Sequence, residues 1–205
     1  MIGIESERLS AEFRRLEELC DRDIPVTLEG VLIHLEHRGH ALLTLFLAGP
    51  FMLPMLPGLS VPFGILIAFF AFSMAFGRKP FLPKSWLARE LPKDKLRKFS
   101  RAAQSFFKKF ERLFKPRLVW LIDLRAGQIT IATLIALCGI LLALPLPPGT
   151  NSPPASVIIA LSIGFLERDG FLVILGYILF LLNIAFFTFL AIFGYEGVMN
   201  LWRMI

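Results

Sequence analysis

The stretch LPGLSVPFG at residues 56–64 interrupts a long apolar sequence with prolines and glycines. A similar stretch, LPLPPGTNSPPA, interrupts a second apolar sequence at residues 144–155. Prolines and glycines of the two stretches correspond at an offset of 91 residues, in the pairs Pro57 and Pro148, Gly58 and Gly149, and Pro62 and Pro153. A constant offset, with apolar sequence on both sides of each break, predicts an internal repeat of two helical hairpins.

The composition is that of an integral membrane protein. Hydrophobic residues make up 56% of the 205 residues and the mean hydropathy is +0.67, whereas about 45–50% is usual in soluble domains. Five apolar segments cover residues 41–57, 59–77, 129–147, 154–166 and 171–194. We therefore expect an all-α integral membrane protein with two Pro/Gly-broken hairpins, a C-terminal spanning helix and amphipathic helices on the cytoplasmic face.

The fourth apolar segment is too short to cross a bilayer. It holds 13 residues, and a hydrocarbon core of about 30 Å requires about 20 residues of helix. This length is typical of a re-entrant hairpin. Broken helices expose backbone groups that lipid cannot satisfy, so we expect the two breaks to face each other or a partner chain inside the protein.

Charge is distributed very unevenly along the chain. Residues 78–125 hold fifteen Lys and Arg against four Asp and Glu, whereas residues 1–40 hold five Arg against nine acids. The positive-inside rule places the basic linker in the cytoplasm. We expect a multi-pass protein of the bacterial inner (plasma) membrane, in which each hairpin begins and ends in the cytoplasm. The C-terminus is then periplasmic, unless the last segment turns back at Asn183.

Two segments outside the apolar runs have amphipathic helical spacing, at residues 4–22 and 94–115. The second carries Phe and Leu on one face and Lys and Arg elsewhere, which suits an anionic membrane surface. Docking of this helix on the protein's own bundle is the alternative. Nucleic acid also attracts basic patches, but the aromatic stripe favours membrane lipid, so we expect no nucleic-acid partner.

These features predict a chain organised in five parts. They are an N-terminal amphipathic helix at 1–24, a first hairpin at 25–83, a basic linker at 84–125, a second hairpin at 126–170 and a C-terminal helix and tail at 171–205. Five apolar segments are few for a closed pathway, so we expect a homodimer or larger oligomer.

The candidate substrate-binding residues lie at the two breaks and after the second hairpin. They are Pro57, Gly58, Ser60, Pro62, Gly64, Pro147, Gly149, Asn151, Pro154, Arg168 and Asp169. Helix N-termini freed at the breaks attract anionic groups such as phosphate. Arg168 and Asp169 carry charge at the end of the short helix, where they can pair with each other or gate access. Asn183 is expected to hydrogen-bond a neighbouring helix.

Residues for catalysis or metal binding are scarce. His34, His37 and His40 recur every third residue, but such a row drifts around a helix and lacks a carboxylate on the same face. The membrane segments after residue 41 hold no His, and few acids lie near them. We therefore expect no enzyme activity, no cofactor and no metal site.

The chain resembles the ExoD family of bacterial inner-membrane proteins of exopolysaccharide synthesis. The matching stretches are TLEG at 27–30, HRGH at 37–40, LPGLS at 56–60, FG at 63–64, GR at 77–78, FLP at 81–83, KPRL at 115–118, PLP at 145–147, Asn151, PA at 154–155 and GFLERDG at 164–170. The resemblance covers roughly residues 25–195, and Phe81 stands where the family often has Trp. The resemblance implies a link to polysaccharide production but no particular reaction.

Two functions fit these observations. The first is transport or flipping of a polysaccharide-related, lipid-linked or ionic substrate at the interface of the two broken-helix repeats. The alternative is a non-transporting accessory or scaffold protein, which regulates polysaccharide synthesis enzymes through its amphipathic helices.

Overall fold

A computed structural model describes residues 17–18, 27, 39–52, 59–76, 93–94, 97–98, 101, 104–105, 116–144 and 149–204. In this part of the chain the expected all-helical fold is confirmed. Its elements are α3 (Gly39–Ala48), the 3-10 turn η2 (Gly49–Met52), α4 (Ser60–Ala75), α7 (Trp120–Asp123), α8 (Arg125–Ala143), α9 (Ser152–Leu166) and α10 (Gly170–Met204).

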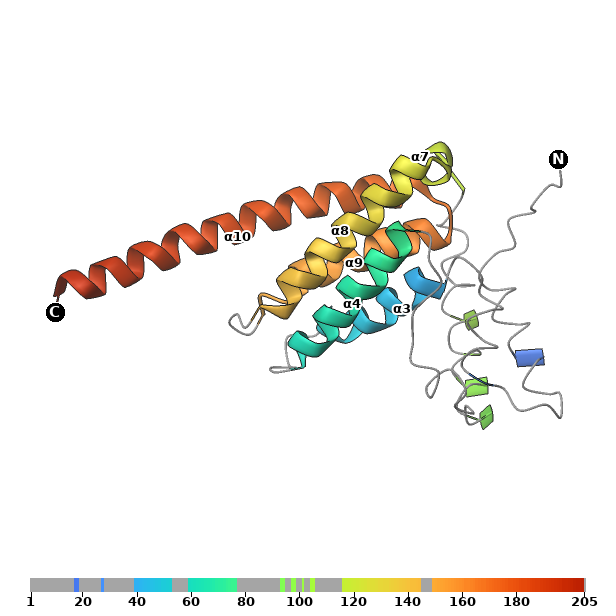
Figure 1. Ribbon diagram of the computed structural model, residues 1–205, viewed down its shortest axis with the longest axis horizontal. Coiled ribbons are helices and arrows are strands. Elements are labelled where there is room, and N and C mark those ends of the chain that lie inside the picture. The colour runs from blue at the N-terminus through green and yellow to red at the C-terminus, as the bar shows by residue number, and fades with distance from the viewer. Residues whose placement is uncertain are drawn as a thin grey trace.

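Four helices form a closed bundle, in which α3 and α8 each pack against both α4 and α9. The fifth, α10, packs along α9 and extends well beyond the other helices (Figure 1). The N-terminus of α4 lies beside the C-terminus of α8, since Gly64 contacts Ala143, and α9 begins directly after the break that follows α8. Both N-termini therefore lie at the end of the bundle where α8 ends. We call this the break end, and we call the opposite end, where α7, α8 and α10 begin, the corner end.

The contact between α4 and α8 is made backbone to backbone. A Cβ added to Gly64 would lie 2.5 Å from the carbonyl oxygen of Gly139 and 2.6 Å from the amide nitrogen of Ala143. A Cβ added to Gly139 would lie 2.8 Å from the amide nitrogen of Ala68. Small residues on both helices therefore permit this close approach, as they do in helix pairs within membranes.

Aliphatic side chains fill the interior of the bundle. Its fully buried members include Ile67 from α4, Ile131, Ile135 and Leu142 from α8, and Val157, Ile158 and Leu161 from α9. On the outer side, Leu161 packs into the space above Gly176 of α10, where an added Cβ would lie 2.4 Å from its Cδ2. The core thus joins both predicted hairpins and the first half of α10.

Two helices are long and apolar enough to cross a membrane, α8 and the Gly170–Phe193 part of α10. Three shorter apolar helices, Gly39–Met52, Ser60–Ala75 and Ser152–Leu166, hold 14 to 16 residues. At a rise of about 1.5 Å per residue these reach about 21–24 Å, which is less than the hydrocarbon thickness of about 30 Å.

The helix bounds follow the predicted apolar segments closely, and α10 runs unbroken through Asn183. The chain therefore does not turn back there. Internal repetition and re-entry into the membrane remain predictions. The amphipathic helices predicted at 4–22 and 94–115 lie largely outside the described residues, as do Pro57, Gly58 and Pro147.

Candidate functional site

The break end holds the described residues that were predicted to bind substrate at the two breaks. Ser60 begins α4 and is buried, whereas Pro62 in the same first turn is exposed. Gly64 lies at the contact with α8. Because both helices begin here, the structure brings the N-termini of α4 and α9 to the same end of the bundle.

The second break enters α9 through a tight turn. Gly149 has a φ of +96°, a left-handed conformation that glycine adopts without a Cβ clash. Asn151 is half-buried and precedes the helix, and its carbonyl oxygen accepts a hydrogen bond of 3.1 Å from the amide of Ala155. Pro154 is buried in the first turn, where a missing amide hydrogen carries no cost.

The break end has no formal charge. Residues 41–77 and 126–166 contain no Asp, Glu, Lys or Arg. Its chemistry consists of hydroxyl groups, the Asn151 amide and the positive ends of two helix dipoles. Such an arrangement can hydrogen-bond neutral groups or attract an anion.

Arg168 and Asp169 lie at the corner end, separated from the break end by the whole length of α9. Fifteen residues of α9 span about 22 Å, so the structure does not bring these two residues to the other predicted site residues. Arg168 has a φ of 54° and terminates α9 in a left-handed conformation. Its guanidinium forms an ion pair with Asp123 of α7.

Asp169 joins α9 to α10. Its amide donates to the carbonyl oxygen of Gly164 at 2.9 Å, and its carboxylate Oδ1 accepts from the amide of Phe171 at 3.0 Å. The second contact caps the N-terminus of α10. The next amide, that of Gly170, donates to the carbonyl oxygen of Arg117 at 2.7 Å, which ties the corner to the segment that leads into α7.

Two buried polar contacts connect helices that are distant in sequence. Thr44 Oγ1 of α3 lies 3.0 Å from Ser162 Oγ of α9, and Thr44 also donates to the carbonyl oxygen of Ala41 at 3.0 Å. Because Thr44 has one hydroxyl proton, Ser162 supplies the proton of the interhelical bond. Sequence analysis missed this pair, since each hydroxyl is a lone polar group in an apolar segment.

The expected contact of Asn183 with a neighbouring helix is confirmed. Its Nδ2 donates to Cys138 Sγ of α8 at 3.8 Å, and both side chains are buried. Asn183 is also the last buried side chain in the part of α10 whose side chains the structure describes, because no side chain between Ile184 and Phe193 is buried. The helix leaves the bundle at this point.

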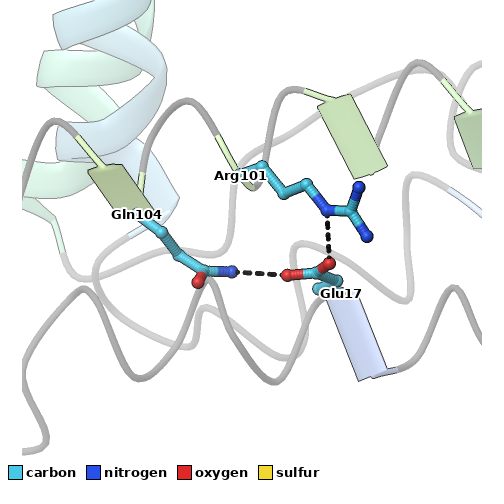
Figure 2. Close-up of polar contacts among 3 residues, drawn as sticks. All are labelled: Glu17, Arg101 and Gln104. Carbon is cyan, nitrogen blue, oxygen red and sulfur yellow. Dashed lines mark hydrogen bonds and ion pairs between the residues drawn. The ribbon is translucent and has the colours of Figure 1, made fainter.

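The acidic N-terminal segment contacts the basic linker. Glu17 accepts hydrogen bonds from Arg101 Nε at 2.6 Å and from Gln104 Nε2 at 3.0 Å (Figure 2). The hydrogen bond from Arg101, followed by that from Gln104, lowers the pKa of the Glu17 carboxyl below its ordinary value. The two segments that were predicted to be docking surfaces thus bind each other at this point.

Comparisons with known proteins agree with the family that the sequence motifs resemble. The family model described as "Exopolysaccharide synthesis, ExoD" matches residues 9–189. Protein ExoD of Rhizobium meliloti is 32% identical over 175 residues, which cover 84% of this chain and 72% of that protein. An uncharacterized protein of Synechocystis sp. is 31% identical over 165 residues, which cover 80% of this chain and 77% of that protein.

No solved structure matches the chain. The family match extends from the N-terminal segment into α10 and includes both breaks and the corner. The chain therefore belongs to the ExoD family, a membrane-associated family with a role in exopolysaccharide synthesis.

Proposed function

We propose that this chain is an inner-membrane accessory protein, which holds or regulates the enzymes of exopolysaccharide production. The observation that carries the proposal is the backbone contact between α4 and α8 at Gly64 and Gly139. This contact and the aliphatic core around it fill the centre of the bundle with packed side chains and backbone. A packed bundle suits a scaffold better than a pathway through one chain.

The second half of the apolar part of α10 supplies the partner surface in this proposal. Between Asn183 and Phe193 most of its large apolar side chains are exposed, including Ile184, Phe189 and Phe193. Phe189 and Phe193 stack with ring centroids 4.1 Å apart, which forms an aromatic ridge on a helix that has left its own bundle. Aromatic side chains contribute strongly to helix interfaces and carry little conformational entropy.

The proposed orientation places the corner end in the cytoplasm and both hairpins as re-entrant loops. Three observations support it. The basic linker precedes the corner, three apolar helices of the hairpins (Gly39–Met52, α4 and α9) are shorter than the hydrocarbon core, and exposed side chains at the break end are apolar. The last group comprises Met52, Leu59, Val61 and Leu144. In this arrangement the break end stays within the membrane and α10 alone reaches the periplasm.

Replacement of the aromatic ridge tests the accessory role. In Phe189→Ala/Phe193→Ala we expect weaker co-purification of a defined glycosyltransferase or polymerase and lower exopolysaccharide yield. The matched control is Phe72→Ala/Phe76→Ala, which removes an exposed stacked pair on α4 with centroids 4.7 Å apart. Unchanged co-purification and yield in the ridge variant, at equal protein level, would contradict the proposal.

Transport at an interface between chains is the second candidate, and the convergence of the α4 and α9 N-termini favours it. Ser60 and Thr150 add buried hydroxyls at this end. Single cysteines at Ser60 and Asn151, in a background lacking Cys20 and Cys138, test whether water reaches both breaks. Labelling of both, blocked by one common solute, and flux above that of empty vesicles would replace the accessory role with transport. Protection of both sites and absence of flux would support the accessory role.

A further inference from the structure

The corner end carries an exposed aromatic and basic surface that neither proposed function uses. We call it the α7 patch and define it as Arg117, Leu118, Trp120, Leu124, Arg125 and Phe171. Its four apolar side chains are exposed to 45–60%, although they belong to the end of the protein that is richest in charge. Contiguous exposed apolar side chains on a protein surface mark a site of interaction with a membrane or another protein. Their exposure in this patch therefore points to such a partner.

The patch has a net positive charge. Arg117 and Arg125 are exposed, and among the described residues neither guanidinium has a carboxylate partner. Asp123, the one acid within the patch's segment, forms an ion pair with Arg168. The two arginines are therefore available for an anionic partner from outside the chain.

The position of the patch identifies the partner. The two helices long enough to cross a membrane, α8 and α10, begin at Arg125 and Gly170, and α7 packs against both of them. Exposed apolar side chains continue along both helices just inside this level, at Ile129 and Leu175. Trp side chains are enriched where hydrocarbon meets headgroups, and arginine forms two-pronged hydrogen bonds with phosphate.

We propose that the α7 patch binds the headgroup phosphates of anionic phospholipids in the cytoplasmic leaflet. Arg117 and Arg125 contact the phosphates, while Trp120 and Phe171 lie at the boundary with the acyl chains. The proposal rests on the membrane placement in the proposed function. It adds a lipid class and a site, and it does not depend on whether the protein holds enzymes or transports a substrate.

The experiment uses the full chain in nanodiscs, with Trp120 as the only tryptophan after Trp86→Phe and Trp202→Phe. Energy transfer from Trp120 to dansyl-phosphatidylglycerol is compared with transfer to dansyl-phosphatidylcholine at equal probe content. We expect enrichment of the anionic probe beside Trp120, by up to about fivefold for each arginine near the surface. The enrichment decreases as salt concentration rises.

Charge variants identify the site. Arg117→Gln/Arg125→Gln abolishes the preference and leaves transfer to the phosphatidylcholine probe unchanged, whereas Arg117→Lys/Arg125→Lys retains most of it. Native mass spectrometry of the chain with all three tryptophans, counting retained phosphatidylglycerol, provides a second readout. Equal transfer to both probes, or a preference that survives the glutamine replacements, overturns the proposal. Release of the chain from membranes by carbonate would instead contradict the membrane placement, so the two failures are distinguishable.

Discussion

Gly64 of α4 and Gly139 of α8 lie so close that neither position has room for a methyl group. A Cβ on Gly64 would lie 2.5 Å from the carbonyl oxygen of Gly139, and a Cβ on Gly139 would lie 2.9 Å from the carbonyl oxygen of Gly64. Each glycine is followed four residues later by alanine, Ala68 in α4 and Ala143 in α8. The same small-residue spacing on both helices joins the first predicted hairpin to the second.

Alanine at this contact is expected to destabilise the bundle. Because the atoms that a new Cβ would meet belong to the backbone, Gly64→Ala and Gly139→Ala should each lower the free energy of unfolding by about 1–3 kcal/mol. The matched control is Gly49→Ala, where nothing lies within 4 Å of an added Cβ. Denaturant titration in detergent, followed by circular dichroism, measures all three. Equal stability of Gly64→Ala and Gly49→Ala would disprove the close approach.

The carboxylate of Asp169 caps α10, so its loss should weaken the corner. Asp169→Ala is expected to lower stability by about 0.5–2 kcal/mol, while Asp169→Ser, which retains a capping oxygen, restores most of the loss. Hydrogen exchange at the amides of Phe171 and Val173 provides the local measurement. If serine and alanine behave alike, the cap is not the source of the effect.

Removal of the hydroxyl pair between α3 and α9 should lower the free energy of unfolding only slightly, because hydrogen bonds between membrane helices contribute little to stability. In a double-mutant cycle of Thr44→Val and Ser162→Ala we expect a coupling energy of about 0.6 kcal/mol and at most about 1.7 kcal/mol. Ser73→Ala is a useful control, since that hydroxyl bonds the backbone of its own helix at Phe69. Zero coupling would mean that the two hydroxyls do not bond each other.

The contact between Glu17 and Arg101 should be sensitive to acid. The pKa of Glu17 lies below its ordinary value of 4.5, so the contact stabilises the folded state above pH 4.5 and is lost as the pH falls through the lower folded-state pKa. Dyes on cysteines at Glu18 and Ser105, in a background lacking Cys20 and Cys138, report the separation of the two segments. We expect the separation to increase in acid and in high salt.

Glu17→Gln is the control for this titration. It removes the titrating carboxylate while keeping a side chain of similar size, so the acid-dependent increase should disappear. A separation that increases identically in the parent and in Glu17→Gln would assign the change to other groups.

Apolar runs predicted the helices because membrane helices must cover their backbone with apolar side chains. The segment predicted at 154–166 corresponds to α9 at Ser152–Leu166, and that predicted at 59–77 corresponds to α4 at Ser60–Ala75. The start of α8 was predicted at 129, four residues later than Arg125. Charge in a first turn lies at the membrane surface and does not interrupt a helix, so hydropathy alone places such a start too late.

The contacts of the predicted site residues could not be read from the sequence. Gly64 was predicted to bind substrate, and the structure shows it packed against Gly139. The paired Gly-x-x-x-Ala spacing is a sequence signal that the prediction did not use. Arg168 was predicted to pair with Asp169 or to gate access, whereas its ion pair in the structure is with Asp123, and the sequence gives no means of placing Asp123 beside it. The partner of a charged side chain depends on how the chain turns between one helix and the next, and local sequence does not specify this geometry.

The length of α10 determines how far its distal end moves when the helix tilts. The helix begins at the corner end, packs along α9 with its last described buried side chain at Asn183, and continues as a helix to Met204, well beyond the other helices (Figure 1). At about 1.5 Å per residue, a rotation about the corner displaces Met204 about two and a half times as far as Asn183. A tilt of α10 at the contact of Leu161 with Gly176 would therefore move the distal end of the helix farther than any residue inside the bundle.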